Sequence, residues 1–224
     1  MFMRKSSPRI LTNQTGPHPK LKQIPVGTST YMACYPVSLN VLEICQKIKK
    51  EQDKSDWCLL LDSGCGTGDS TINIAKSYPD YLVLGIDKSS KRLNQAQQKI
   101  NSENVRFITA NLVEFWIGLK LVNASIAANF ILYPNPWPKQ KHLKKRWHAH
   151  PVMPLLPMIS KYIELRTNWR IYAEEFCGRL TKLTGSVMTV EKINPTNPIS
   201  AFEEKYFESN HDLFRLRYGR LDSF

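Results

Sequence analysis

A chain of 224 residues is long enough for one domain with a buried core, and its hydrophobic fraction of 42% is ordinary for a globular protein. Lys and Arg number 31 against 19 Asp and Glu, and the formal net charge of +12 favours a polyanionic partner, either nucleic acid or an acidic membrane surface. Apolar runs stay well short of the ~20 residues that span a bilayer, and the first residues lack the apolar stretch of a secretory signal. The five cysteines form no C-x-x-C pair, which is typical of reduced thiols. We therefore expect a cytoplasmic protein without a membrane segment.

Residues 1–30 are rich in Pro, Gly, Ser, Thr and Lys and have little periodic apolar content, so we expect a flexible basic arm. A single domain is expected over residues 31–224, because no internal repeat divides them. It begins with a helix at 37–50, where the apolar residues have helical spacing.

Short apolar runs then alternate with helical segments. Strands are expected at 57–64, 81–87, 105–111 and 124–133, and helices at 69–78, 89–101 and 112–119 between them. Further on, we expect helices at 154–162 and 170–180 around a strand at 163–168, and two strands at 185–193 and 213–221 in an antiparallel hairpin. This order predicts an α/β protein with a doubly wound, mostly parallel sheet whose last strand is reversed.

The sharpest local signal is "LLLDSGCGTGDS", in which Gly64, Gly66 and Gly68 alternate between a strand and a helix. Glycine is needed where the backbone turns with positive φ or approaches a ligand, and α/β sheets bind nucleotides at such a turn. Asp87 ends the second strand, where an acid can accept hydrogen bonds from both hydroxyls of a ribose. Asp62 precedes the loop and could face the positive end of a cofactor. A ligand-free helix cap is the alternative.

This arrangement resembles the S-adenosylmethionine site of Rossmann-like methyltransferases. The resemblance implies that Gly64, Gly66 and Gly68 pack the methionine and ribose region of the cofactor, that Asp87 holds the ribose, and that Asn111 lies near the adenine.

The fourth expected strand runs into "YPNPWPKQKHLKKRW", at the point where a doubly wound sheet places its ligands. Pro134, Pro136 and Pro138 stiffen this loop and hold Asn135 and Trp137 in place. The stretch resembles the Pro-Asp-Pro-Trp motif and Lys/His/Arg-rich run of the bacterial tRNA (guanine-N7-)-methyltransferases. "LRTNWRIYAEEF" and "ISAFEEKYF" resemble two further motifs of that family, so the likeness runs from about Leu59 to Phe207.

The resemblance implies an enzyme that methylates guanine N7 in tRNA with S-adenosyl-L-methionine. A monomer is the simplest expectation for its oligomeric state. The resemblance places Asn135 as the catalytic residue facing the guanine, and it implies substrate contacts from two groups of residues. These are Trp137, Lys139, Lys144, Lys145 and Arg146 on one side of the cleft, and Thr167, Asn168, Tyr172, Ser200 and Glu203 on the other. The N-terminal arm would assist in holding the tRNA backbone.

The chain departs from the family pattern at four positions: Asn135 and Asn168 replace motif acids, Ser200 replaces a Thr, and Asn111 stands where the family often has an acid. Because guanine N7 has a free lone pair and no proton to remove, we expect the altered site to stay active. "NPW" also partly resembles the Asn-Pro-Pro-aromatic motif of methyltransferases that act on exocyclic amines. The alternatives are therefore a methyltransferase for another RNA position or a small molecule, and a catalytically retired RNA-binding descendant.

Two other groups of reactive side chains point to no chemistry. His142, His148 and His150 have no spacing of a standard metal site, so no metal is expected. Cys65, in the glycine loop, has no evident base beside it, and we interpret it as a small packing residue.

Overall fold

The computed structural model describes residues 6–25, 29–55 and 57–221, and its strands form one seven-stranded sheet. Across the sheet the strands are β3 (Val105–Thr109), β2 (Tyr81–Asp87), β1 (Cys58–Ser63), β4 (Ile126–Leu132), β5 (Ser160–Thr167), β7 (Leu213–Tyr218) and β6 (Val190–Ile193). The first five are parallel, and β7 is antiparallel to both of its neighbours. The predicted doubly wound sheet with a reversed last strand is confirmed, and its strand order reverses between β1 and β4.

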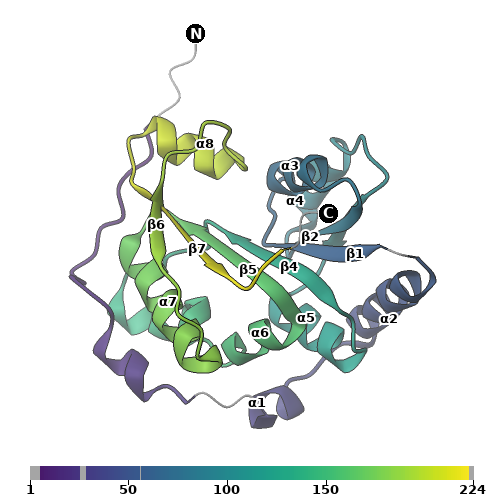
Figure 1. The fold of residues 1–224 in the computed structure, drawn as a ribbon, viewed down its shortest axis with the longest axis horizontal. Helices are drawn as coiled ribbons and strands as arrows, with labels where there is room; N and C mark the ends of the chain where they lie inside the picture. The colour runs from purple at the N-terminus through teal and green to yellow at the C-terminus, as the bar shows by residue number, and fades with distance from the viewer. Residues whose placement is uncertain (1–5, 26–28, 56, 222–224) are drawn as a thin grey trace.

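Helices cover both faces of this sheet, as Figure 1 shows. In chain order they are α1 (Ser29–Cys34), α2 (Leu39–Lys54), α3 (Asp69–Ser77), α4 (Ser90–Gln97), α5 (Leu112–Leu121), α6 (Leu156–Ile159), α7 (Arg170–Thr184) and α8 (Ala201–Glu208). Short 3-10 helices lie at η1 (Pro19–Gln23), η2 (Gln140–Lys145), η3 (Trp147–Ala149) and η4 (Met153–Leu155). None of the described helices is long and apolar enough to cross a membrane.

Alternate residues of each central strand enter different hydrophobic clusters. Leu59 and Leu61 of β1 pack in the cluster that includes residues of α2, α5, α6 and α7. Leu60, between them, packs instead with Ile74 of α3 and Phe130 of β4. Because both faces are covered, the strand needs apolar residues at every position, which explains why "CLLL" reads as a continuous run. Burial of each leucine stabilises the fold by about 1.5–3 kcal/mol.

Two expected elements differ in extent from the observed ones. The helix expected at 154–162 is only the single turn α6, because β5 already begins at Ser160 to pair with Ile126 of β4. The two last strands are antiparallel as predicted, but α8 stands in their connection, so they do not form a simple hairpin. Ser200 caps α8 by accepting a hydrogen bond from the backbone N–H of Glu203.

The flexible arm expected at the N terminus is not what the structure shows for residues 6–25. Gln14 and His18 are buried, and both bind Glu175 of α7, which lies beside this segment in Figure 1. Further along, Arg179 of α7 donates a hydrogen bond to the carbonyl of Ile24 at 2.8 Å. Composition predicted disorder because the segment has few apolar residues, but its polar groups are matched by buried polar groups on α7. Residues 29 and 30 of the predicted arm begin α1, and residues 1–5 and 26–28 lie outside the described residues.

Candidate active site

The glycine loop follows β1, and all three of its glycines have positive φ: 89° at Gly64, 58° at Gly66 and 80° at Gly68. They have different surroundings. A Cβ at Gly68 would lie 2.5 Å from the ring of Phe107, so this glycine allows α3 to pack closely on the sheet. A Cβ at Gly66 would meet nothing within 4 Å, and one at Gly64 would make only an ordinary contact. The loop therefore offers open backbone at Gly64 and Gly66, where a ligand can approach.

Asp87, at the end of β2, lies against this loop. Its carboxylate accepts hydrogen bonds from the backbone N–H groups of Gly66 at 3.2 Å and Ser89 at 2.8 Å, and Arg92 lies 3.0 Å from it. A carboxylate has about four acceptor positions, so it retains capacity for a further donor. The open glycine backbone beside a largely buried acid at a strand end fits a ribose-containing cofactor.

Asp62 lies below the loop and is only 1% exposed. One of its carboxylate oxygens accepts hydrogen bonds from the hydroxyls of Ser70 at 2.5 Å and Thr71 at 2.7 Å, both in the first turn of α3. Burial raises the pKa of Asp62 to about 6, although the two hydroxyls act in the opposite direction. The observed contacts give Asp62 a role in fixing α3 to β1, and its predicted contact with a cofactor stays a prediction.

Asn111 completes the predicted cofactor residues, and Cys65 lies within the glycine loop. The side chain of Asn111 caps α5 by accepting from the backbone N–H of Val113 at 2.9 Å, and the residue is exposed at the end of β3. Burial raises the pKa of the Cys65 thiol, which keeps it protonated and supports its interpretation as a packing residue. A small cleft in front of the loop is lined by Gly64, Cys65, Thr67, Asp69, Ser70, Leu132, Ser200, Ala201 and Phe202.

The loop after β4 begins beside this cleft and contains two residues with strained backbone. Tyr133 has φ 49° and Trp137 has φ 46°, which non-glycine residues seldom adopt. The side-chain oxygen of Asn135 accepts a hydrogen bond from the backbone N–H of Trp137 at 3.3 Å, and the Asn135 side chain is exposed. The backbone N–H of Tyr133 donates to the carbonyl of Arg166 in β5 at 2.7 Å, which fixes the start of the loop to the sheet.

Glu203 of α8 is fully buried beneath this loop. It accepts hydrogen bonds from the Tyr133 hydroxyl at 2.7 Å and from the Arg166 guanidinium at 3.1 Å. It therefore joins α8 to the ends of β4 and β5. Glu203 can influence a substrate only indirectly, through Tyr133 and Arg166, which corrects its predicted direct contact. Phe202, next to it, is 51% exposed and lines the cleft.

The basic stretch divides into exposed lysines and a buried arginine. Lys139, Lys144 and Lys145 are exposed, and the ammonium group of Lys145 lies 4.5 Å from the centre of the Trp137 ring. Arg146 is 0% exposed, so it cannot contact a phosphate at the surface as predicted. Its guanidinium stacks on Trp169, 4.7 Å from the ring centre. The prediction treated all cations of the run alike, whereas the side chain of Arg146 is part of the protein interior.

Arg146 and Glu175 form a buried polar cluster together with Gln14, which we call the Arg146–Glu175 cluster. Arg146 donates to Glu175 at 2.7 Å and to the side-chain oxygen of Gln14 at 3.0 Å. Glu175 also accepts from the Gln14 amide and from the backbone N–H of His18, both at 2.7 Å. Sequence analysis missed Gln14 and Glu175, because the members of this cluster are far apart along the chain: Gln14 lies 132 residues from Arg146, and Arg146 lies 29 residues from Glu175.

His148 is buried at the edge of this cluster, with its Nε2 2.7 Å from a carboxylate oxygen of Glu175. Burial lowers the pKa of His148, so the ring is neutral at physiological pH. Burial opposes the charge of Glu175, but the nearby His148 ring, the backbone N–H of His18 and Arg146 prevail and lower its pKa to about 2. In the part of the chain that the structure describes, no group of three or more His, Cys, Asp or Glu side chains could hold a metal ion.

The remaining predicted substrate residues lie at the ends of β5 and α7. Thr167 is buried and accepts from the backbone N–H of Trp169 at 3.2 Å, and Tyr172 is buried with its hydroxyl accepting from the backbone N–H of Trp147 at 3.1 Å. Tyr172 therefore supports the basic stretch from inside, which corrects its predicted place on the cleft wall. Only Asn168 of this group lines open space.

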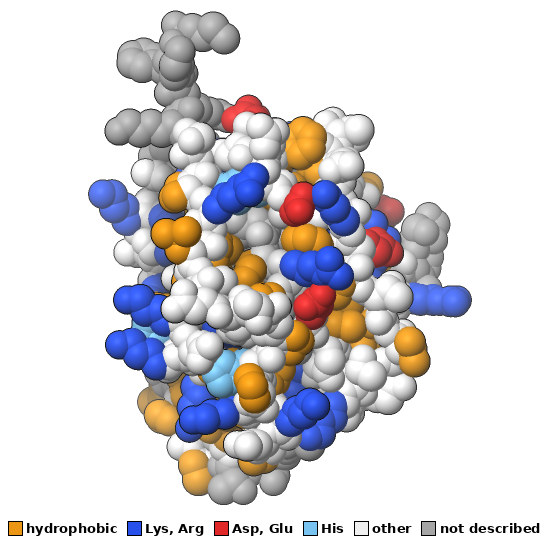
Figure 2. All heavy atoms as spheres, turned by 90° about the vertical axis from the view of Figure 1, so that its left-hand side faces the viewer, with side chains coloured by type: hydrophobic (Ala, Val, Ile, Leu, Met, Phe, Trp, Pro, Cys, Tyr) orange, Lys and Arg blue, Asp and Glu red, His pale blue; other side chains and the backbone are white. Residues whose placement is uncertain are grey.

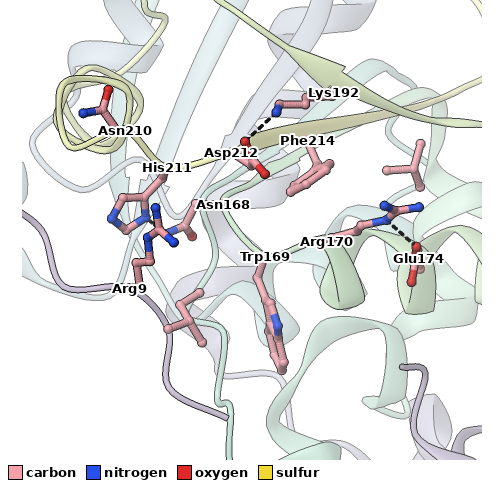
Figure 3. Close-up of a pocket in the computed structure, with 12 residues that line it drawn as sticks. Arg9, Asn168, Trp169, Arg170, Glu174, Lys192, Asn210, His211, Asp212 and Phe214 are labelled. Carbon is pink, nitrogen blue, oxygen red and sulfur yellow. Dashed lines mark hydrogen bonds and ion pairs between the residues drawn. The ribbon is translucent and has the colours of Figure 1, made fainter. Parts of the chain in front are cut away.

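That space is a cavity of about 590 Å³ on the side of β5 away from the glycine loop, shown in Figure 3. Asn168 lies 3.0 Å from the ring of His211, and the rim carries the exposed ion pairs Arg170–Glu174 at 2.8 Å and Lys192–Asp212 at 2.6 Å. Arg170 and Lys192 are thus paired with acids, and Arg9 also lines the cavity.

Comparison with known proteins identifies a methyltransferase family for this chain. Residues 56–216 match the family Methyltransf_4, which is described as "Putative methyltransferase". A tRNA (guanine-N(7)-)-methyltransferase of Nitrosococcus oceani is 28% identical over 167 residues, which cover 72% of this chain and 71% of the relative. The enzyme of the same name from Neisseria meningitidis serogroup C is 29% identical over 171 residues, with 72% and 71% coverage.

Solved structures share the fold at lower identity. "Structure of an Antibiotic Related Methyltransferase" superposes with a TM-score of 0.56 at 18% identity and covers 83% of this chain and 97% of that one. The 16S rRNA methyltransferase KamB gives a TM-score of 0.56 at 15% identity, with coverage of 84% and 96%. These similarities concern the sheet and its helices.

Proposed function

Because the chain belongs to the Methyltransf_4 family of methyltransferases, we propose that it transfers a methyl group from S-adenosylmethionine to N7 of a guanine in tRNA. The curated relatives carry the name of this activity. The observation that carries the proposal is the exposed Asn135 on a stiff loop that leaves β4 beside the glycine cleft. A substrate base held by this loop would meet a cofactor held by Gly64, Gly66 and Asp87.

The cofactor would lie against the open backbone of Gly64 and Gly66, with its ribose hydroxyls donating to Asp87. When bound, it supplies a sulfonium-activated methyl group. Arg92 lies 3.0 Å from the same Asp87 carboxylate and balances its charge. Thr67 and Asp69 line the same cleft and form a hydrogen bond with each other at 2.8 Å, which stiffens the loop next to Gly66.

Methylation of N7 requires positioning more than proton transfer. The N7 lone pair is free, so the enzyme needs no general base, and alignment of the two reactants supplies most of the acceleration. The Asn135 oxygen already accepts from Trp137 but has a second lone pair that can accept from an N–H of the guanine edge. An amide lacks the negative charge of an acid, so Asn135 orients the base and contributes less stabilisation to the positive charge that develops on it.

The exposed lysines of η2 and its flanks would bind the RNA backbone. Lys139, Lys141, Lys144 and Lys145 lie on one short segment beside Trp137, whose ring can stack on a nucleobase. Figure 2 shows the face that includes the N-terminal segment, where Lys and Arg side chains outnumber Asp and Glu. We propose that the protein acts on tRNA as a monomer in the cytoplasm.

Nucleoside mass spectrometry on unmodified tRNA, incubated with the protein and S-adenosylmethionine, tests this function. We expect 7-methylguanosine to form, and to fall at least tenfold with Asn135→Ala. Asn101→Ala is the matched control, because Asn101 is an exposed asparagine that precedes the edge strand β3, whereas Asn135 follows the central strand β4. A different methylated nucleoside would overturn the substrate. Cofactor binding without methylation of tRNA would point to another substrate, and absence of both would favour a retired RNA-binding protein.

A further inference from the structure

The N-terminal segment acts on two consecutive carbonyl groups of the loop after β4, on one of them directly and on the other through Arg146. The hydroxyl of Thr12 donates a hydrogen bond to the carbonyl oxygen of Pro138 at 3.1 Å. The carbonyl oxygen of Trp137 accepts from Nε of Arg146 at 3.2 Å, and the same guanidinium is held by Gln14. The two contacts come from residues two positions apart in a segment that the sequence predicted to be flexible.

The composition of the loop explains why such outside contacts matter. Pro134, Pro136 and Pro138 have no backbone N–H, so these residues can be fixed by backbone hydrogen bonds only through their carbonyl groups. Trp137 holds a left-handed conformation that it would leave if its neighbours allowed. Within the loop, the Asn135–Trp137 hydrogen bond holds it in place. From other segments, Thr12 donates to the carbonyl of Pro138 and Arg146 donates to that of Trp137.

Gln14 is itself fixed in one orientation. Its amide nitrogen donates to Glu175 at 2.7 Å and to the carbonyl of Gly16 at 2.8 Å, so its oxygen is left to face Arg146. Arg146 is therefore held on three sides, by Glu175, Gln14 and the Trp169 ring. A guanidinium fixed in this way presents its Nε to Trp137 at a defined place.

We propose that Thr12 and Gln14 are positioning residues of the methyl-transfer site. Thr12 acts directly on Pro138, and Gln14 acts through Arg146 on Trp137; together they hold Asn135 in the orientation that aligns the substrate base. This inference rests on the proposed function for its activity assay. Since it concerns alignment and not affinity, loss of these contacts lowers kcat and leaves KM for tRNA and the affinity for the cofactor nearly unchanged.

Replacement of Thr12 provides the cleanest test, because the residue is only half-buried and its change removes one hydroxyl. That hydroxyl donates to the carbonyl of Pro138 and also accepts from the backbone N–H of Gln14 at 3.1 Å, so its loss affects both positioning residues. We expect Thr12→Val to lower kcat about fivefold or more, and Thr12→Ser to restore it. Thr15→Val is the matched control: Thr15 is exposed three residues further along, and its variant should equal the wild type. An unchanged kcat in Thr12→Val, or a loss that Thr12→Ser does not restore, would overturn the proposal.

A second measurement separates this inference from the proposed function. Hydrogen–deuterium exchange of peptides covering residues 133–141 reports on the loop whether or not tRNA is the substrate. We expect faster exchange in Thr12→Val and in Gln14→Met than in Thr15→Val. If the wild type methylates no tRNA but the exchange changes as expected, the proposed substrate is wrong and the positioning role of Thr12 and Gln14 stands. If tRNA is methylated and neither exchange nor kcat responds, that positioning role is refuted.

Discussion

Replacement of Glu175 by glutamine should unfold the protein at a markedly lower temperature. The carboxylate is the partner of Arg146, and both side chains are fully buried and 2.7 Å apart. Glutamine keeps the size of the side chain and can accept from Arg146, but it removes the charge. The guanidinium then stays in the interior without a counter-ion, because it cannot lose its proton.

Breaking a buried ion pair by removing one partner costs about 3–5 kcal/mol. The lowered pKa of Glu175 agrees in direction, because the folded state favours the ionised form of this carboxyl. For a chain of this length, a loss of 3 kcal/mol lowers Tm by about 10 °C.

Thermal unfolding at pH 7, followed by circular dichroism, measures the change, and Glu174→Gln is the control. Glu174 precedes Glu175 in α7 and pairs with Arg170, whose side chain is 72% exposed, so its replacement should change stability by less than about 1 kcal/mol. The pH dependence gives a further check. A carboxyl with a depressed pKa stabilises the fold above pH ~4.5 and loses that contribution as the pH falls towards 2. If Glu175→Gln lowers Tm no more than Glu174→Gln does, Arg146 does not depend on this charge.

Three further changes test the cofactor loop and the basic stretch. Gly66→Ala should abolish S-adenosylmethionine binding in calorimetry while the protein stays folded, whereas Gly68→Ala should destabilise the fold because its Cβ would meet Phe107; equal behaviour of the two would contradict the division of roles. Replacing Lys144 and Lys145 by glutamine should flatten the salt dependence of tRNA binding by about 0.7–0.9 per lost phosphate contact, and an unchanged slope would remove them from the RNA surface. Asp62→Asn should raise the free energy of unfolding at pH 8 by as much as about 3 kcal/mol, because a carboxyl whose pKa is raised to about 6 stabilises the fold only at lower pH; chemical denaturation at pH 4 and pH 8 would show a wild-type decline that the variant lacks.

The fold was predictable because its signals are local. Apolar runs such as "CLLL" and "YLVLGI" have to be strands covered on both faces, and the glycines between them mark the turn into α3. The exposed Asn135 and the lysines around it were placed by a motif whose prolines are themselves local constraints. Short-range rules were sufficient where short-range physics determines the structure.

The misplaced residues share a different property. Arg146, Tyr172 and Glu203 are polar side chains that the sequence predicted to face a substrate, and all three are buried with partners on other elements. Nothing in the sequence near Arg146 distinguishes it from Lys145, because the difference lies in Glu175 and Gln14. Polar pairing over such separations depends on the assembled fold, and one sequence without its relatives does not show it.

The order in which the chain is made bears on the Arg146–Glu175 cluster. Gln14 lies 132 residues before Arg146 and 161 residues before Glu175. At translation rates of about 5–20 residues per second, the N-terminal segment waits roughly 8–30 seconds before its partner on α7 exists. The earliest residues to be synthesised are therefore among the last to reach their native place, and a chain interrupted before α7 leaves Arg146 without a counter-ion. The contacts of Arg146 that hold the loop after β4 can therefore form in full only after α7 has been synthesised.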